Sequence, residues 1–217
     1  MHTPKRPDRR RLSQWEPFRV VGDNFRVYLT LNVCTYGVLL AGFGVGLLFP
    51  GLRDSQQARL EDDGTADLVQ SIFQNPWLFA LVILAVNVGK LSVITIVVPS
   101  MIVPFGGMVT FAYWTAQTGV TLAPASDIGW VALIPHSITL IVELQAYILL
   151  VLGAYLLGWA WLRPESVGAQ THRAGYRGGL RKLGWLSIPA TVLLVFGALY
   201  EAFSLRYLVN PLAQWLL

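Results

Sequence analysis

Five apolar runs, each close to the length that crosses a bilayer, constrain the fold of this chain more than any other feature. The runs cover residues 26–48, 77–98, 101–118, 135–162 and 183–208. A transmembrane helix needs about 20 mostly apolar residues. Charged residues make up 13% of the chain, whereas an average soluble domain carries roughly 25%. The sequence therefore predicts an all-α fold, a polytopic membrane bundle of about five transmembrane helices without a separate soluble domain.

The second and third runs adjoin, so one long kinked helix could replace them. Pro99 and Pro104 lie five residues apart, and Gly106 and Gly107 follow at once. Proline removes a helical hydrogen bond, and paired glycines mark turns. This spacing favours a tight hairpin between two helices.

Charged residues between the runs indicate how the chain is oriented. Loops on the cytoplasmic side of a membrane carry an excess of lysine and arginine. Five spans with a cytoplasmic N-terminus place the basic segments 1–25 and 163–182 on that side. The acidic segment 51–76 and the C-terminal tail 209–217 then lie outside. A four-span topology would separate the two basic segments, so five spans agree better with the charge pattern.

Residues 12–25 precede the first run and are too polar to span the membrane. Trp15 and Phe18 alternate there with Arg19 and Asp23. Such a pattern is typical of an amphipathic helix lying in the membrane interface. A disordered basic arm is the alternative.

The glycine-rich segment before the last run is predicted to be a flexible basic loop that faces lipid. Its cationic residues are Arg173, Arg177, Arg181 and Lys182. Basic clusters beside a membrane attract anionic lipid headgroups. The alternative is that these residues only determine topology.

Pairs of small residues predict where helices pack closely. Gly42 and Gly46 are four residues apart in the first run, as are Ala154 and Gly158 in the fourth. Small residues at this spacing let helix backbones approach each other in lipid.

Ionisable residues inside the runs are the main candidates for function. They are Lys90, His136, Glu143 and Glu201, and the polar Asn87 lies near them in the second run. A charge at the bilayer centre costs roughly 2.5–3.5 kcal/mol on insertion scales. The helical rise places Glu143 and Glu201 about 10–12 Å below the outer surface. We therefore expect one buried polar layer in the outer leaflet.

Two carboxylates that share a site of low dielectric constant do not readily ionise together. We expect one of Glu143 and Glu201 to stay protonated and to bond the other or Asn87, with His136 above them and Lys90 deeper. Such a layer could fix helix register or form a proton or ion path. A metal site is disfavoured because histidine ligands are too few, so neither a metal nor another cofactor is predicted.

The pattern predicts no catalytic residue. The runs hold no Ser–His pair and no His-Glu-x-x-His motif, so the chain is expected not to be an enzyme. The net charge of +4 comes from basic residues that flank the apolar runs. This placement explains the charge by topology, and no nucleic-acid partner is predicted.

Three motifs resemble those of the stage II sporulation protein M family. Pro135-His136-Ser137 followed by Glu143 resembles the family's Pro-His-Gly…Glu motif, and Tyr200-Glu201-Ala202-Phe203 resembles its terminal Glu-Ala-Phe. The segment 23–27 resembles the entry to one of its spans. Ser137 replaces the family's glycine, and the spacing from histidine to glutamate is longer here.

The resemblance implies a non-enzymatic membrane scaffold or assembly subunit that recruits or positions partner proteins. It also implies the plasma (inner) membrane of a prokaryote as the location. The partner proteins are unidentified, and a homo-oligomer is left open. A small transporter or permease subunit, coupled to protons, ions or an ATPase and using the His/Glu layer, is the alternative.

Overall fold

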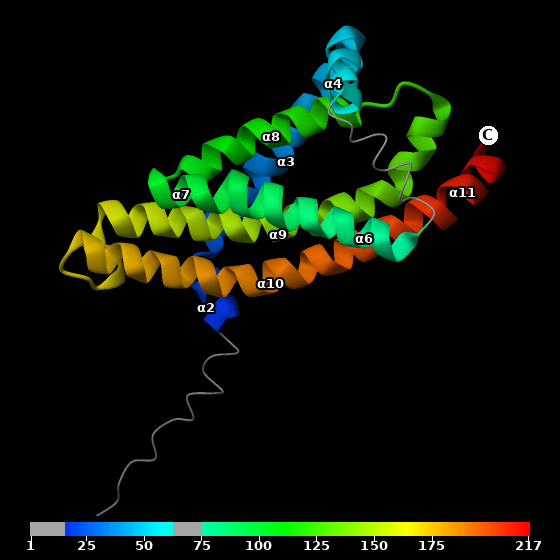
Figure 1. Cartoon of the computed structure of the whole chain (residues 1–217). Coiled ribbons are helices and arrows are strands. Elements are labelled where there is room, and N and C mark those ends of the chain that lie inside the picture. Colours follow the sequence, from blue (N-terminus) through cyan, green and yellow to red (C-terminus); the bar gives the residue numbers. More distant parts are fainter. Residues whose placement is uncertain (1–15, 63–74) are drawn as a thin grey trace, which may run out of the picture.

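The computed structural model describes residues 16–62 and 75–217, and within them the chain is helical apart from short connections and has no strand (Figure 1). The N-terminal helices are α2 (Glu16–Asp23), α3 (Phe25–Leu48) and α4 (Pro50–Asp62). The middle of the chain forms α6 (Pro76–Ala85), η1 (Val86–Val97), α7 (Val98–Ile102) and α8 (Gly106–Leu122). The C-terminal part forms α9 (Asp127–Leu162), η2 (Pro164–Val167), α10 (His172–Tyr207) and α11 (Val209–Leu216). The predicted all-α class is confirmed.

Among the described residues, four helical segments are long and apolar enough to cross a membrane. They are Phe25–Leu48, Pro76–Ile102, Asp127–Leu162 and His172–Tyr207. The helix α8, which corresponds to the predicted third span, has 17 residues. This length is at the lower limit of about 17–25 residues for a transmembrane helix. The chain is thus a multi-pass membrane protein of at least four candidate spans.

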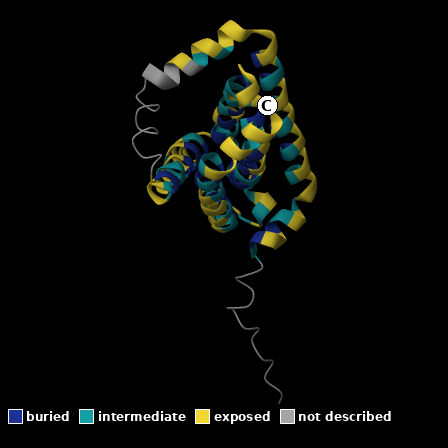
Figure 2. Ribbon diagram, turned by 90° about the vertical axis from the view of Figure 1, so that its right-hand side faces the viewer, coloured by how far each residue is buried: buried dark blue, intermediate teal, exposed yellow. Residues whose placement is uncertain are grey.

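The helix α9 is the centre of the bundle. In its most apolar stretch, 67% of the residues are buried inside the protein, against 22% in α3 and 33% in α10. Figure 1 shows α6, η1 and α7 running beside α9 and α10, whereas α3 crosses these helices obliquely. Figure 2 shows exposed residues on the outer faces of the helices. The second half of α9 is buried on most sides, whereas Ile134, Ile138 and Ile141 in its first half are exposed, and both settings favour apolar residues in a membrane protein.

The predicted hairpin between the second and third runs is present. The chain turns between Ile102 and Gly106, and Phe105 adopts a left-handed conformation with φ of 64°. However, the sequence predicted that the first helix of the hairpin ends before Pro99, and this is wrong. The helix continues through Pro99 to Ile102. Pro99 has no N–H to donate to the Thr95 carbonyl, but the Thr110 hydroxyl on α8 donates to that oxygen. Side-chain donors of this kind let membrane helices tolerate proline.

Two helices begin earlier than predicted. The helix α9 begins at Asp127, so Pro135 lies inside it. The side chain of Ser126 caps this start by accepting a hydrogen bond from Gly129 N. The prediction of a flexible loop over residues 163–182 is also wrong in part, because residues 172–182 are helical. Thr171 caps α10 by accepting from Ala174 N, so Arg173, Arg177, Arg181 and Lys182 all lie on a helix. Side-chain caps at both starts supply the backbone with partners and extend the helices.

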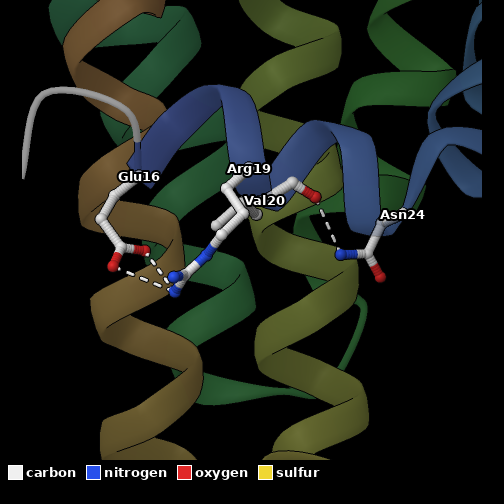
Figure 3. A network of polar contacts seen from close by, with 4 residues as sticks. All are labelled: Glu16, Arg19, Val20 and Asn24. Carbon is white, nitrogen blue, oxygen red and sulfur yellow. Dashed lines mark hydrogen bonds and ion pairs between the residues drawn. The ribbon is translucent and has the colours of Figure 1, made fainter. Parts of the chain in front are cut away.

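The N-terminal segment and the C-terminal tail are helical where they are described. The predicted interfacial helix corresponds to α2, and residues 1–15 lie outside the described residues. Asn24 separates α2 from α3, since its side chain donates to the Val20 carbonyl (Figure 3). The predicted tail forms the short helix α11.

The small residues of the first run face α8. A Cβ atom on Gly42 would overlap the carbonyl oxygen of Ala116, and one on Gly46 would overlap that of Val120. On α9, Ala154 is fully buried, and Gly158 faces the ring of Phe105 in the hairpin turn. Glycine at these positions permits close approach of two backbones.

Candidate functional site: a buried polar layer

Three helices bring four of the five predicted layer residues together. Asn87 at the start of η1 donates a hydrogen bond of 2.5 Å to Oε1 of Glu143 on α9. His136, two turns before Glu143 on α9, places Nδ1 3.4 Å from Oε1 of Glu201 on α10. Gly197 on α10 leaves room for the Glu143 side chain, because a Cβ there would lie 3.0 Å from Glu143 Cγ. The layer therefore links α9 to η1 and to α10.

The two carboxyl groups have separate partners. Of the two contacts that the sequence left open for the carboxyls, the structure shows the one between Glu143 and Asn87. Glu201 is instead paired with His136, which the sequence placed above the two carboxyls without naming it as their partner. Each pair joins different helices, so the layer fixes η1, α9 and α10 against one another. Removing one partner would leave a buried polar group unsatisfied.

Lys90 does not belong to this layer, contrary to the expectation from sequence. Its side chain is exposed on the surface of the bundle. Lys90 follows Asn87 by three residues within a π-helix, whose turns hold more residues than those of an α-helix. The two side chains therefore lie on different faces of η1, and only Asn87 faces Glu143.

The π-helix η1 is unusually long, with 12 residues. Two hydroxyl side chains in η1 bond to carbonyls with the same five-residue spacing as the backbone of a π-helix. Ser92 donates to the carbonyl of Asn87, and Thr95 donates to that of Lys90, each five residues earlier and at 2.9 Å. Most π-helical segments are single turns and are frequent at functional sites. In this protein the π-helix starts beside Asn87 and so determines which residues reach Glu143.

Two further polar groups extend the layer along α9. Thr139 and Tyr147 lie four residues before and after Glu143, on the same face of the helix. Both side chains are 0% exposed, and neither hydroxyl has a hydrogen-bond partner among the described residues. Together with His136 they form a polar stripe along α9. Their spacing of four residues from Glu143 is a sequence signal that could have identified them.

A second polar cluster, which is half-buried and which sequence reasoning missed, joins α3 to α9. Gln145 accepts a hydrogen bond of 2.5 Å from the Tyr28 hydroxyl. Its amide donates to Asn32 Oδ1 at 2.7 Å and to the Tyr36 hydroxyl at 3.1 Å. The three α3 residues are spaced four apart, so they share one face. Gln145 follows Glu143 by about 200° around α9 and therefore points to the opposite side.

The basic residues of α10 are divided between two environments. Arg173, Arg177 and Arg181 are exposed, and Lys182 is half-buried, but only two of the four line a cavity. Arg181 and Lys182 line a cavity between α10 and α2, together with Arg19 and Trp185. Arg19 also contacts Glu16 one turn earlier on α2 (Figure 3).

Within the described residues, no group of three or more histidine, cysteine, aspartate or glutamate side chains is arranged to hold a metal ion. Comparison of the chain with protein-family models, with curated protein sequences and with solved structures gives no match. The polar layer is thus defined by its own geometry, as a set of paired side chains that are buried or half-buried between the helices of a multi-pass membrane protein.

Proposed function

We propose that the protein is a non-enzymatic polytopic membrane scaffold or assembly subunit that positions partner proteins at the membrane. The observation that carries this proposal is the pairing of polar groups between helices. Asn87 with Glu143, His136 with Glu201, and Gln145 with its α3 partners each hold two helices in register. Interhelical hydrogen bonds of this kind stabilise bundles in lipid. A rigid bundle suits a protein that holds others in place.

The resemblance to the stage II sporulation protein M family supports the same function. The residues that carry this resemblance, His136, Glu143 and Glu201, are those that form the layer. We therefore assign them a structural role within a scaffold. We also propose, from the resemblance, that the protein resides in the plasma membrane of a prokaryote.

Purification in mild detergent tests the proposed function. The tagged full-length protein should retain a peripheral or extracytoplasmic protein, and the same partner should be recovered after crosslinking in intact cells. A variant that keeps the fold, Glu143→Gln, should retain this partner as well. If the purified protein instead retains a nucleotide-binding subunit, the scaffold proposal is wrong.

A five-span topology with a cytoplasmic N-terminus completes the proposal. In Figure 1, the α6–α7 segment, α8, α9 and α10 run in alternating directions, and α3 crosses them obliquely. Four basic residues of α10, which are Arg173, Arg177, Arg181 and Lys182, lie in its first third, beside the turn between α9 and α10, and Arg206 lies at the other end. This arrangement supports the positive-inside orientation.

Cysteine labelling tests the topology. After replacement of Cys34, a cysteine at Ala125 should react with an impermeant maleimide added outside cells, and one at Gln170 should react only after permeabilisation. Both positions are exposed, and Ala125 avoids the capping Ser126. Labelling of Gln170 from outside would contradict five spans with a cytoplasmic N-terminus.

A second candidate function is a small transporter or permease subunit. The observation that favours it is the pair of buried hydroxyls, Thr139 and Tyr147, that have no partner among the described residues. With His136 and Glu143 they form a polar stripe that could pass a proton or small cation along α9. Ionisable groups buried in membrane spans commonly mark such paths.

A further inference from the structure

A cavity of about 390 Å³ lies between α2 and the first half of α10. Five charged side chains line it. They are Glu16, Arg19 and Asp23 from α2, and Arg181 and Lys182 from α10. Three are cationic and two are acidic, so the cavity has a surplus of one positive charge. The cavity is separate from the polar layer.

The charged groups are not equally available to a ligand. Arg19 makes two contacts with the Glu16 carboxylate, at 3.0 and 2.9 Å, so these two side chains largely neutralise each other (Figure 3). Neither Arg181 nor Lys182 has an ion partner among the described residues. The positive charge of the cavity therefore lies on its α10 side.

The surroundings combine this charge with apolar groups. Val20 and Val167 line the cavity, as does the indole of Trp185. The apolar part of α10 begins just beyond Lys182. Tryptophan is enriched where membrane meets water, and α2 is amphipathic, as expected of an interfacial helix. A ligand here would place a charged group in the cavity and an apolar part along the helices.

We propose that this cavity binds the headgroup of one anionic phospholipid, with the phosphodiester against Arg181 and Lys182. Basic pockets beside membrane helices can hold lipid phosphates. The bound lipid would connect α2 to α10, because the cavity is lined from both helices. This inference does not depend on the scaffold proposal, since it concerns a different part of the molecule.

Native mass spectrometry of the full-length protein in mild detergent tests the inference. Phosphatidylglycerol and phosphatidylcholine are added in turn to the delipidated protein. We expect one phosphatidylglycerol molecule to bind before any others, and more tightly than phosphatidylcholine. The double variant Arg181→Gln/Lys182→Gln should bind it about 30-fold more weakly, since each cation near a lipid surface contributes a factor of about five.

The matched control removes the same charge from the same helix outside the cavity. The double variant Arg173→Gln/Arg177→Gln should retain the single tight lipid. Asp23→Asn removes an acidic group from the cavity and should strengthen phosphatidylglycerol binding several-fold, which loss of folding would not produce. Equal weakening by both double variants, or equal binding of both lipids, would overturn the proposal. Displacement of the lipid by millimolar inorganic phosphate would assign the cavity to a soluble phosphate compound and would also overturn it.

Discussion

Replacement of Glu143 by leucine should destabilise the bundle by about 2 kcal/mol, because the Asn87 amide would lose its acceptor in a buried site. Glutamine at the same position keeps a carbonyl oxygen that can accept from Asn87. Glu143→Gln should therefore unfold at nearly the wild-type temperature. Thermal unfolding of the three proteins in one detergent measures the difference.

The control for this comparison is Glu165→Leu, which removes an exposed carboxylate outside the layer. Surface substitutions usually change stability by less than about 0.5 kcal/mol. The same variants separate the two candidate functions. In a scaffold, Glu143→Gln keeps partner binding. In a proton or ion path it abolishes transport and leaves stability unchanged. Equal stability of the leucine and glutamine variants would contradict a structural role for the Asn87 contact.

Replacement of Gly119 by valine should cost about 3 kcal/mol, the upper end of the range for overpacking. A Cβ atom at Gly119 would overlap the carbonyl oxygen of Leu39, and would lie 2.9 Å from Phe43 N and 3.0 Å from Gly42 Cα. These are backbone atoms, which cannot rotate away as a side chain can. The helices α3 and α8 would have to separate, and thermal unfolding together with limited proteolysis should show it.

Gly44→Val is the matched control, since a Cβ atom on Gly44 of α3 would have no atom within 4 Å. It makes the same chemical change without a clash. The control should unfold within about 1 kcal/mol of the wild type, because valine and glycine differ little in helix propensity and the small difference favours valine. A similar loss in both variants would show that close packing of α3 on α8 does not limit stability.

Hydropathy alone located the apolar helices, because each needs a long run of apolar residues in lipid. It could not locate where α9 and α10 begin. Gly175 and Gly179 looked like parts of a flexible loop. In the structure they lie inside α10, where a Cβ atom would meet Ala160 O or Leu157 Cα. These glycines serve helix packing, and a single sequence does not distinguish that use from a turn.

The polar layer was partly predictable from depth. Counting residues from the ends of the runs placed Glu143, Glu201 and Asn87 at similar levels, and the structure brings them into one region. The exclusion of Lys90 depends on the π-helical turn of η1, for which the sequence gives no clear signal. Gln145 was overlooked because it is not ionisable, although its α3 partners recur every four residues.

The bond from Thr110 to the Thr95 carbonyl bears on how the chain enters the membrane. Without it, the carbonyl that Pro99 leaves free would face hydrocarbon, and an unsatisfied backbone group in lipid costs several kcal/mol. The 17-residue α8 is in turn short for independent insertion. The α8 helix supplies the Thr110 hydroxyl to the first helix of the hairpin, and that longer apolar helix supports the insertion of the short α8. We expect the insertion machinery to release residues 76–122 into lipid as one unit during synthesis.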